Sequence, residues 1–111
     1  MNNPSRLLGL ILIFVLFIGF GCAQADTEND LVQLRGEIDT IDKQILELLN
    51  QRAEVVLEIG EFKKKNDLGV YDPNREKQIE KNLAEMNNGP MPDKSVINIF
   101  RAIISACREL Q

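Results

Sequence analysis

One long amphipathic segment restricts what this chain can fold into more than any other feature. From Leu31 to Phe62, apolar residues recur at steps of three and four, the spacing of one face of an α-helix. Arg52 lies on this face, seven residues after Ile45 and seven before Ile59, where a helical core favours leucine or isoleucine. A cation on an apolar face needs a partner, and no acidic residue shares the stripe, so Arg52 is a candidate functional residue. The residues of this apolar seam are Leu31, Leu34, Ile38, Ile41, Ile45, Leu48, Val55, Ile59 and Phe62.

The seam belongs to a helix that we predict from Thr27 or Asn29 to about Lys65, which at 1.5 Å per residue is roughly 57 Å long. Gly36 and Gly60 lie inside this helix, where each costs roughly 1 kcal/mol relative to alanine. Close approach of another helix or of a ligand is the reason we expect for these glycines, and simple tolerance is the alternative. The residues expected to end the helix are Asn66, Asp67 and Gly69.

Two shorter helices are predicted after the long one. Asp72 offers an N-cap acceptor and Pro73 suits the first helical position, so a second helix begins there and continues through Met86. After a turn, Asp93 is expected to cap a third helix that runs to Gln111. Because no segment shows a strand pattern, the sequence predicts an all-α chain with one long and two shorter helices.

The length of the first helix predicts a homodimer. With two short partners it cannot form a compact monomer, because about half of its apolar seam would stay open to water. Two copies with their long helices side by side would cover both seams in an intertwined helical bundle. Arg35 and Lys63 share a face of this helix but lie about 42 Å apart, too far for one small ligand. Arg35 of the partner subunit would instead complete a site at Arg52 and Lys63, which gives two shared sites per dimer.

The first 25 residues resemble an export signal. Leu7 to Phe20 is almost wholly apolar and too short for a comfortable membrane span of roughly 20 residues. Cleavage before Cys22 would leave a lipidated cysteine, and cleavage after Ala25 would release an ordinary secreted domain; an uncleaved anchor is the third alternative. We therefore expect a signal peptide over residues 1–25 and a folded domain over residues 26–111. The protein is expected to be periplasmic or secreted, with contact to a membrane only through the signal or a Cys22 lipid anchor.

Composition excludes several function classes. The net charge is −4 and the longest basic run is Lys63 to Lys65, which argues against a nucleic-acid partner. The chain has no histidine and no cluster of cysteines or carboxylates at ligand spacing, so we expect no metal site. Cys107 lies on the apolar stripe of the third helix and is expected to be a small buried hydrophobe.

Five short segments, in this order and at these spacings, carry a resemblance to a known family. They are Leu31–Asp42 (LVQLRGEIDTID), Leu48–Arg52 (LLNQR), Gly60–Lys63 (GEFK), Asp72–Glu76 (DPNRE) and Ile99–Gln111 (IFRAIISACRELQ). The chain resembles the all-helical chorismate mutases, in particular the mutase domain found in bifunctional chorismate mutase/prephenate dehydratase. The resemblance implies the Claisen rearrangement of chorismate to prephenate in aromatic amino-acid biosynthesis, without a cofactor or a metal.

The resemblance also implies how cations and donors would act. The substrate is a dianion, and negative charge develops on its ether oxygen in the transition state, so fixed positive groups and hydrogen-bond donors suit the reaction. Arg52 and Arg35 of the partner subunit would clamp the two carboxylates, for which a planar guanidinium is better shaped than an ammonium. Lys63 would donate to the ether oxygen and to a carboxylate. Gln111, the final residue on a helix end prone to fraying, would be the second donor to the ether oxygen.

Four further residues would complete the substrate site by the same resemblance. Glu76 would accept a hydrogen bond from the ring hydroxyl, and Asp72 would lie near the same group. Arg75 would brace the carboxylates and their acidic neighbours. Cys107 stands where some relatives have a serine that touches a carboxylate, and a thiol is a weaker donor than a hydroxyl.

Two other functions remain as alternatives. An isochorismate pyruvate-lyase of the same fold would use nearly the same cations, and Glu76 is the reason for preferring the mutase. A dimeric helical envelope lipoprotein without catalytic activity is the alternative from a different class, but it leaves Arg52 on the seam unexplained.

Overall fold

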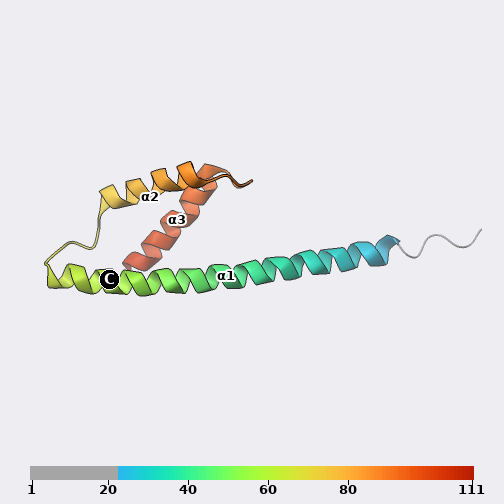
Figure 1. The fold of residues 1–111 in the computed structure, drawn as a ribbon, viewed down its shortest axis with the longest axis horizontal. Coiled ribbons are helices and arrows are strands. Elements are labelled where there is room, and N and C mark those ends of the chain that lie inside the picture. The colour runs from blue at the N-terminus through green and yellow to red at the C-terminus, as the bar shows by residue number, and fades with distance from the viewer. Residues whose placement is uncertain (1–22) are drawn as a thin grey trace, which may run out of the picture. The chain divides into compact units, whose positions relative to one another are not determined.

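The computed structural model describes residues 23–111, and within that range it contains three helices and no strand (Figure 1). They are α1 (Ala23–Lys65), α2 (Pro73–Met86) and α3 (Asp93–Arg108). The prediction of an all-α chain with one long and two shorter helices is confirmed. Residues 1–22 of the predicted signal peptide lie outside the described residues, and no helix of the described part combines enough length and apolar character to cross a membrane.

The predicted start of the long helix was wrong, because α1 begins at Ala23, before either Thr27 or Asn29. Neither proline nor glycine interrupts the residues from Ala23 to Thr27, so nothing in this stretch stops the helix from extending towards the N-terminus. Thr27 and Asn29, which were expected as N-cap residues, therefore lie inside the helix. Helix boundaries set by one polar residue are the weakest part of such a prediction.

The C-terminal end of α1 is fixed by a left-handed residue. Asp67 has a φ of 59°, and the Leu68 backbone N–H donates to the Lys63 carbonyl at 2.8 Å. This bond is the long one of a Schellman motif, which satisfies a carbonyl that the helix itself leaves free. Gly69 has no positive φ, so the left-handed residue that ends the helix is Asp67 and not the glycine, which is the residue type that favours this conformation.

The predicted start of α2 is confirmed in detail. Asp72 is the N-cap, its Oδ1 accepts from the Arg75 backbone N–H at 3.0 Å, and Pro73 is the first helical residue. Proline is favourable at this position because its missing N–H has no partner in a helix anyway. The cap fixes where the first turn of α2 begins, and with it the placement of Glu76 one turn later.

Both predicted ends of α3 were wrong. Pro92 is the N-cap without a side-chain bond, and Asp93 is the first helical residue. The Asp93 carboxylate instead accepts from Asn87 Nδ2 at 2.6 Å, a contact across the turn that competes with capping. The helix ends at Arg108 rather than at Gln111, and the Gln111 backbone N–H donates to the Arg108 carbonyl at 3.2 Å in a tighter final turn.

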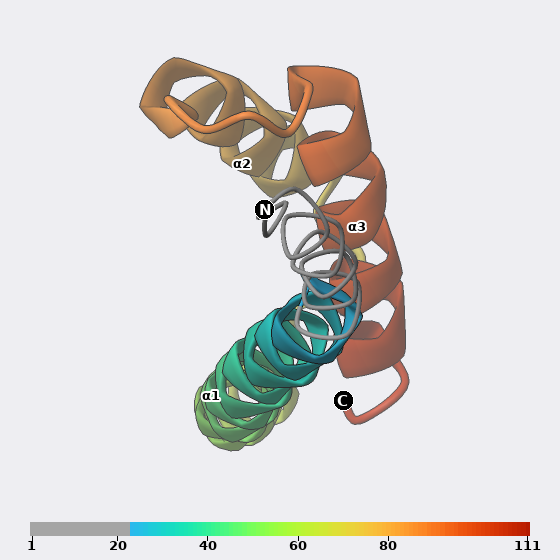
Figure 2. The same cartoon turned by 90° about the vertical axis from the view of Figure 1, so that its right-hand side faces the viewer.

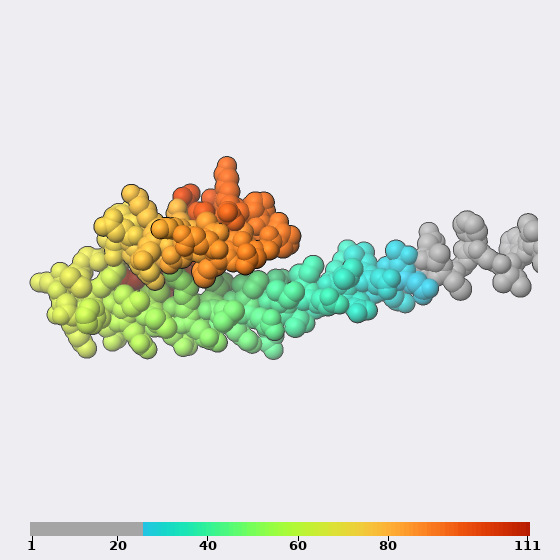
Figure 3. All heavy atoms as spheres, turned by 45° about the horizontal axis from the view of Figure 1, so that its top comes forward, coloured from blue at the N-terminus to red at the C-terminus, as the bar shows by residue number. Residues whose placement is uncertain are grey.

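Residues 23–40 and residues 41–111 fall into two units. In the second unit α2 packs on α3 (Figure 2), and the space-filling view shows the yellow and orange segment of the chain in front of the green one (Figure 3). The buried apolar side chains of the described part are Val56 on α1 and Cys107 on α3. Val55, the seam member next to Val56, is 54% exposed, so the buried face of α1 coincides only in part with the seam.

The seam of α1 is open along its whole length. In the first unit Leu31, Leu34 and Ile38 are 47%, 55% and 56% exposed. In the second unit Ile41 and Leu48 are 53% and 61% exposed. Each unit therefore leaves apolar side chains of the seam open to solvent.

Candidate active site

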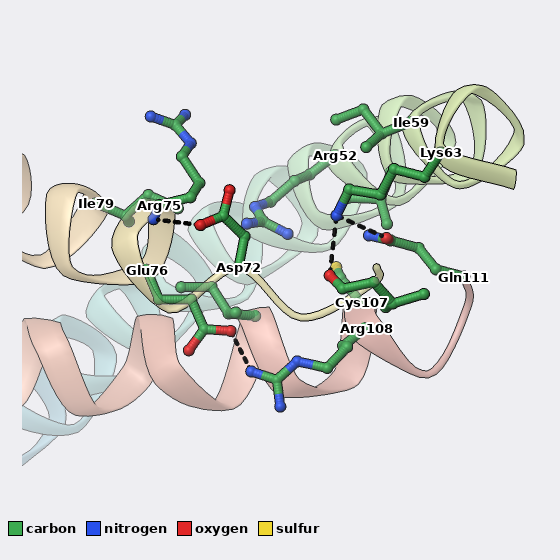
Figure 4. A pocket seen from close by; sticks show the side chains of 13 residues that line it. Arg52, Ile59, Lys63, Asp72, Arg75, Glu76, Ile79, Cys107, Arg108 and Gln111 are labelled. Atoms are coloured by element: carbon green, nitrogen blue, oxygen red, sulfur yellow. Dashed lines mark hydrogen bonds and ion pairs between the residues drawn. The ribbon is translucent and has the colours of Figure 1, made fainter. Parts of the chain in front are cut away.

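A cavity of about 330 Å³ lies within the unit of residues 41–111. Its walls are the C-terminal part of α1, the first turns of α2 and the last turns of α3 with the residues that follow (Figure 4). Seven of the eight predicted site residues line it: Arg52, Lys63, Asp72, Arg75, Glu76, Cys107 and Gln111. The eighth, Arg35, belongs to the other unit of the chain. The placement brings the predicted residues together, and their roles stay predictions.

Positive side chains outnumber negative ones around the cavity. The cations are Arg52, Lys63, Arg75 and Arg108, and the carboxylates are Asp72 and Glu76, which leaves a surplus of two positive charges. Among the described residues no three histidine, cysteine, aspartate or glutamate side chains come together as a metal site would require. A concave site with this surplus attracts a small dianion.

Arg52 has the donor that most needs an acceptor. Its side chain projects from α1 towards the cavity (Figure 4). Within the described residues its Nη1 is buried and has no hydrogen-bond partner. A buried guanidinium nitrogen without a partner costs desolvation free energy that a bound carboxylate would recover. This environment fits the interpretation of Arg52 as an anion-binding residue.

Lys63 and Gln111 meet at one end of the cavity. Lys63 Nζ donates to Gln111 Oε1 at 3.3 Å and to the Val70 carbonyl at 2.9 Å (Figure 4). With its oxygen bound to the ammonium, the amide of Gln111 keeps its NH2 group for another acceptor. The Lys63 ammonium and the Gln111 NH2 group are thus adjacent, and the resemblance assigns both of these donors to the ether oxygen of the substrate.

Gly60 allows this meeting. A Cβ built on Gly60 would lie 3.2 Å from Gln111 Cγ and 3.4 Å from Gln111 Cα. The expected close approach is therefore found at Gly60, and the neighbour is the residue that follows α3. At Gly36 nothing in the described part of the chain lies within 4 Å of such a Cβ.

We expect Gly60→Ala to lower turnover while the fold persists. The added methyl group raises helix propensity by about 1 kcal/mol, but Gln111 must move to accept it. A shifted donor lowers the rate by about tenfold if the amide acts in the reaction. The measurements are kcat and the melting temperature, with Gly69→Ala as the control, because a Cβ on Gly69 meets no atom of the described chain within 4 Å. Equal kcat for the two variants would contradict a role of the Gln111 amide in turnover.

The three charged residues at the start of α2 have different contacts. Asp72 is held as the N-cap of the helix. Arg75 directs its guanidinium away from the other labelled side chains and donates from Nη1 to Gln78 Oε1 at 3.3 Å (Figure 4). Glu76 forms an ion pair with Arg108 of α3. In this arrangement Glu76 faces the cavity, whereas the Arg75 head group would have to turn to contact a ligand.

Arg108 is a cavity residue that the sequence pattern did not predict. It directly follows Cys107, and its side chain lies on the cavity side of α3. The available signal was its position near the end of the third helix, three residues before Gln111. Cys107 itself is buried, 8% exposed, as predicted for a small apolar residue, and it also lines the cavity.

Residues 34–111 match the profile of a protein family described as Chorismate mutase type II. The bifunctional chorismate mutase/prephenate dehydratase of Aquifex aeolicus is 42% identical over 87 residues, which cover 75% of this chain and 24% of that protein. The chain thus spans about a quarter of the length of such bifunctional relatives. The chorismate mutase of Methanocaldococcus jannaschii is 30% identical over 82 residues, which cover 73% of this chain and 83% of that protein.

Solved structures have the same fold. A chorismate mutase from Thermus thermophilus superposes with a TM-score of 0.72 at 36% identity, covering 73% of this chain and 92% of the other. The chorismate mutase of Helicobacter pylori, solved in complex with prephenate, gives a TM-score of 0.69 at 27% identity and covers 74% and 89% of the two chains. With a family profile matched over most of its length and a relative of similar size at 30% identity, this chain belongs to the chorismate mutase type II family.

Proposed function

We propose that the protein is a chorismate mutase, which converts chorismate to prephenate by a Claisen rearrangement and thereby serves the biosynthesis of phenylalanine and tyrosine. The reaction needs no covalent intermediate, so a site of fixed charges and donors is sufficient. The names of the relatives support the proposal, since they are chorismate mutases and one was solved with prephenate.

The observation that carries the proposal is the buried Nη1 of Arg52, which has no partner among residues 23–111 and lies in a cavity with a surplus of positive charge. A carboxylate of the substrate would supply the missing acceptor. The adjacent donors of Lys63 and Gln111 suit an ether oxygen that becomes negative as its bond breaks. Glu76 would accept from the ring hydroxyl, with Asp72 nearby. Arg75 would turn towards a carboxylate when substrate is bound.

The test is a direct assay of the purified protein. Loss of the ultraviolet absorbance of chorismate, with prephenate as the product and above the spontaneous rate, is the expected result. Arg101→Met is a suitable control variant because Arg101 does not line the cavity. Pyruvate released from isochorismate, with chorismate left unchanged, would favour the pyruvate-lyase alternative. No turnover of either compound would contradict the proposal and favour a helical envelope protein without catalytic activity.

We also propose that the working protein is a homodimer with shared sites. The open seam of α1 supplies an apolar surface for a second copy. The sequence spacing of Arg35 and Lys63 corresponds to about 42 Å for an ideal helix, so we expect Arg35 of the partner subunit, and not that of the same chain, to join a site at Lys63. Arg35 of the partner subunit would bring a further guanidinium to a dianion that carries two carboxylates.

Subunit mixing tests the shared site. Arg35→Ala and Lys63→Ala should each be nearly inactive alone, because each damages every site of its homodimer. In a heterodimer of the two, both changes fall in one site and the other site is intact, so mixing should restore up to about a quarter of wild-type activity if subunits exchange at random. Gel filtration before mixing checks that each variant is still a dimer. Verified exchange without any recovery of activity would mean that each site is built from one chain.

Export is a further proposal, supported by the apolar run from Leu7 to Phe20 and by the two cleavage sites of the sequence. A mature protein in the periplasm or medium, beginning at Cys22 with a lipid or just after Ala25, is the expected product. Fractionation and the mass of the N-terminal peptide separate the two forms. A protein that keeps its first residues and stays in the cytoplasm would contradict the proposal.

A further inference from the structure

Arg108 is a charged cavity residue for which the proposed mechanism has no use. Its Nη2 donates to Glu76 Oε1 in an ion pair (Figure 4). The guanidinium carbon also lies 4.7 Å from the centroid of the Tyr71 ring, within the range of a cation–π contact. The side chains of Arg108 and Glu76 are 37% and 28% exposed, so both are partly shielded from water. Arg108 is therefore held by contacts with a ring and a carboxylate rather than extended into solvent.

A second ion pair between the same helices provides an internal comparison. Arg101 donates from Nε and Nη2 to the two carboxylate oxygens of Glu80, at 2.6 and 2.9 Å. Its hydrogen bonds hold the pKa of the Glu80 carboxyl below its usual range. Neither residue lines the cavity. The Arg101–Glu80 pair thus links α2 to α3 in a purely structural way, whereas the Arg108–Glu76 pair makes the same link at the wall of the cavity.

We propose that Arg108 is a positioning residue that acts through Glu76, and this inference rests on the proposed function. The ion pair fixes the Glu76 carboxylate in one orientation, with its second oxygen left to accept from the ring hydroxyl of the substrate. The Tyr71 ring in turn holds the guanidinium in place. An acceptor that is fixed before the substrate binds loses less conformational freedom in the complex than a mobile one.

The ion pair has a second consequence, which concerns charge. Glu76 is an anion in a site that must hold a dianion, and like charges in a partly shielded cavity repel one another. Arg108 balances the charge of Glu76 and leaves Arg52 and Lys63 available for the substrate. Without Arg108, the Glu76 carboxylate would be mobile and would repel the dianionic substrate. We therefore expect kcat to fall and KM to rise.

The experiment is a double-mutant cycle on the whole protein, with chorismate as the substrate. Arg108→Met should lower kcat/KM by about tenfold in the wild-type background, which is the size expected for one charge-assisted contact. In the Glu76→Gln background the same change should cost less than about twofold, because the carboxylate that Arg108 orients is gone. Arg101→Met is the matched control: it also removes an arginine of α3 from an ion pair with α2, and it should leave kcat/KM unchanged in both backgrounds.

Arg108→Lys keeps the positive charge without the planar fork, so it should restore KM more fully than kcat. It is the deciding variant if Arg108→Met lowers the melting temperature much more than Arg101→Met does. An equal loss of kcat/KM in both backgrounds, no loss in either, or the same loss in Arg101→Met would each overturn the positioning role. A wild-type protein that does not convert chorismate would instead overturn the proposed function on which the inference rests.

Discussion

Arg52→Leu should make the protein more stable and nearly inactive at the same time. Leucine repairs the apolar seam and removes a buried nitrogen that has no partner among the described residues. We expect a gain of about 1 kcal/mol in the free energy of unfolding, seen as a higher melting temperature. Loss of the guanidinium that holds a substrate carboxylate should lower kcat/KM by about a thousandfold, on the order of 4 kcal/mol.

The opposite signs make this prediction specific. A residue that only supports the fold would lose stability and activity together when it is replaced. Val56→Ala is the control for that behaviour, because Val56 is a buried apolar residue one turn along the same face of α1. It should lower the melting temperature by removing packed methyl groups. If Arg52→Leu melted at a lower temperature and still turned over chorismate, Arg52 would be a structural residue and its role in the site would be wrong.

Much of the fold follows from local patterns in the sequence. The recurrence of apolar residues at steps of three and four is enough to predict one long helix, and the Asp72–Pro73 pair is enough to predict where α2 begins. These signals act within one or two turns of a helix, so they do not depend on the rest of the fold. The exposure of the seam residues of α1 also agrees with the sequence, because the two shorter helices of the described chain are too short to cover the whole seam.

Two of the differences arise where a residue outside the helix in question decides. Asp93 has the right side chain for an N-cap, but Asn87 from the end of α2 takes its carboxylate, and Pro92 becomes the cap residue. The close approach at Gly60 was expected, whereas its neighbour, Gln111, depends on how α3 returns to α1. Helix propensity and residue spacing describe one helix at a time. These contacts join two parts of the chain, so neither signal predicts them.

The candidate site shows the same division. Seven predicted residues line one cavity. They could be predicted because their order and spacing resemble those of a family whose site residues are known. Arg108 was missed because its meaning comes from the packing of α2 on α3, which sets it opposite Glu76, and from the loop residue Tyr71. On the sequence alone it is one more arginine at a helix end, where a cation is common because it interacts favourably with the helix dipole.

Gln111→Glu should make the enzyme nearly inactive at pH 8 and let it recover as the pH falls. The proposed task of Gln111 is to donate a hydrogen bond to an oxygen that becomes negative, which an amide does at any ordinary pH. A carboxylate has no proton to donate and repels that oxygen, so the loss should be on the order of 3 kcal/mol in the barrier, about a hundredfold in rate. A carboxylic acid regains its proton towards a pH of about 4, and the protonated group can donate again.

The measurement is the pH profile of kcat for the variant and for the wild type, with circular dichroism at each pH to verify the fold. Wild-type activity should change little over the same range, because an amide does not titrate. Asn82→Asp is the control for an added negative charge, since Asn82 is an exposed residue of α2 that does not line the cavity. Its profile should follow that of the wild type. Parallel profiles for Gln111→Glu and the wild type would mean that the amide is not at the ether oxygen, and that its bond to Lys63 has a structural role instead.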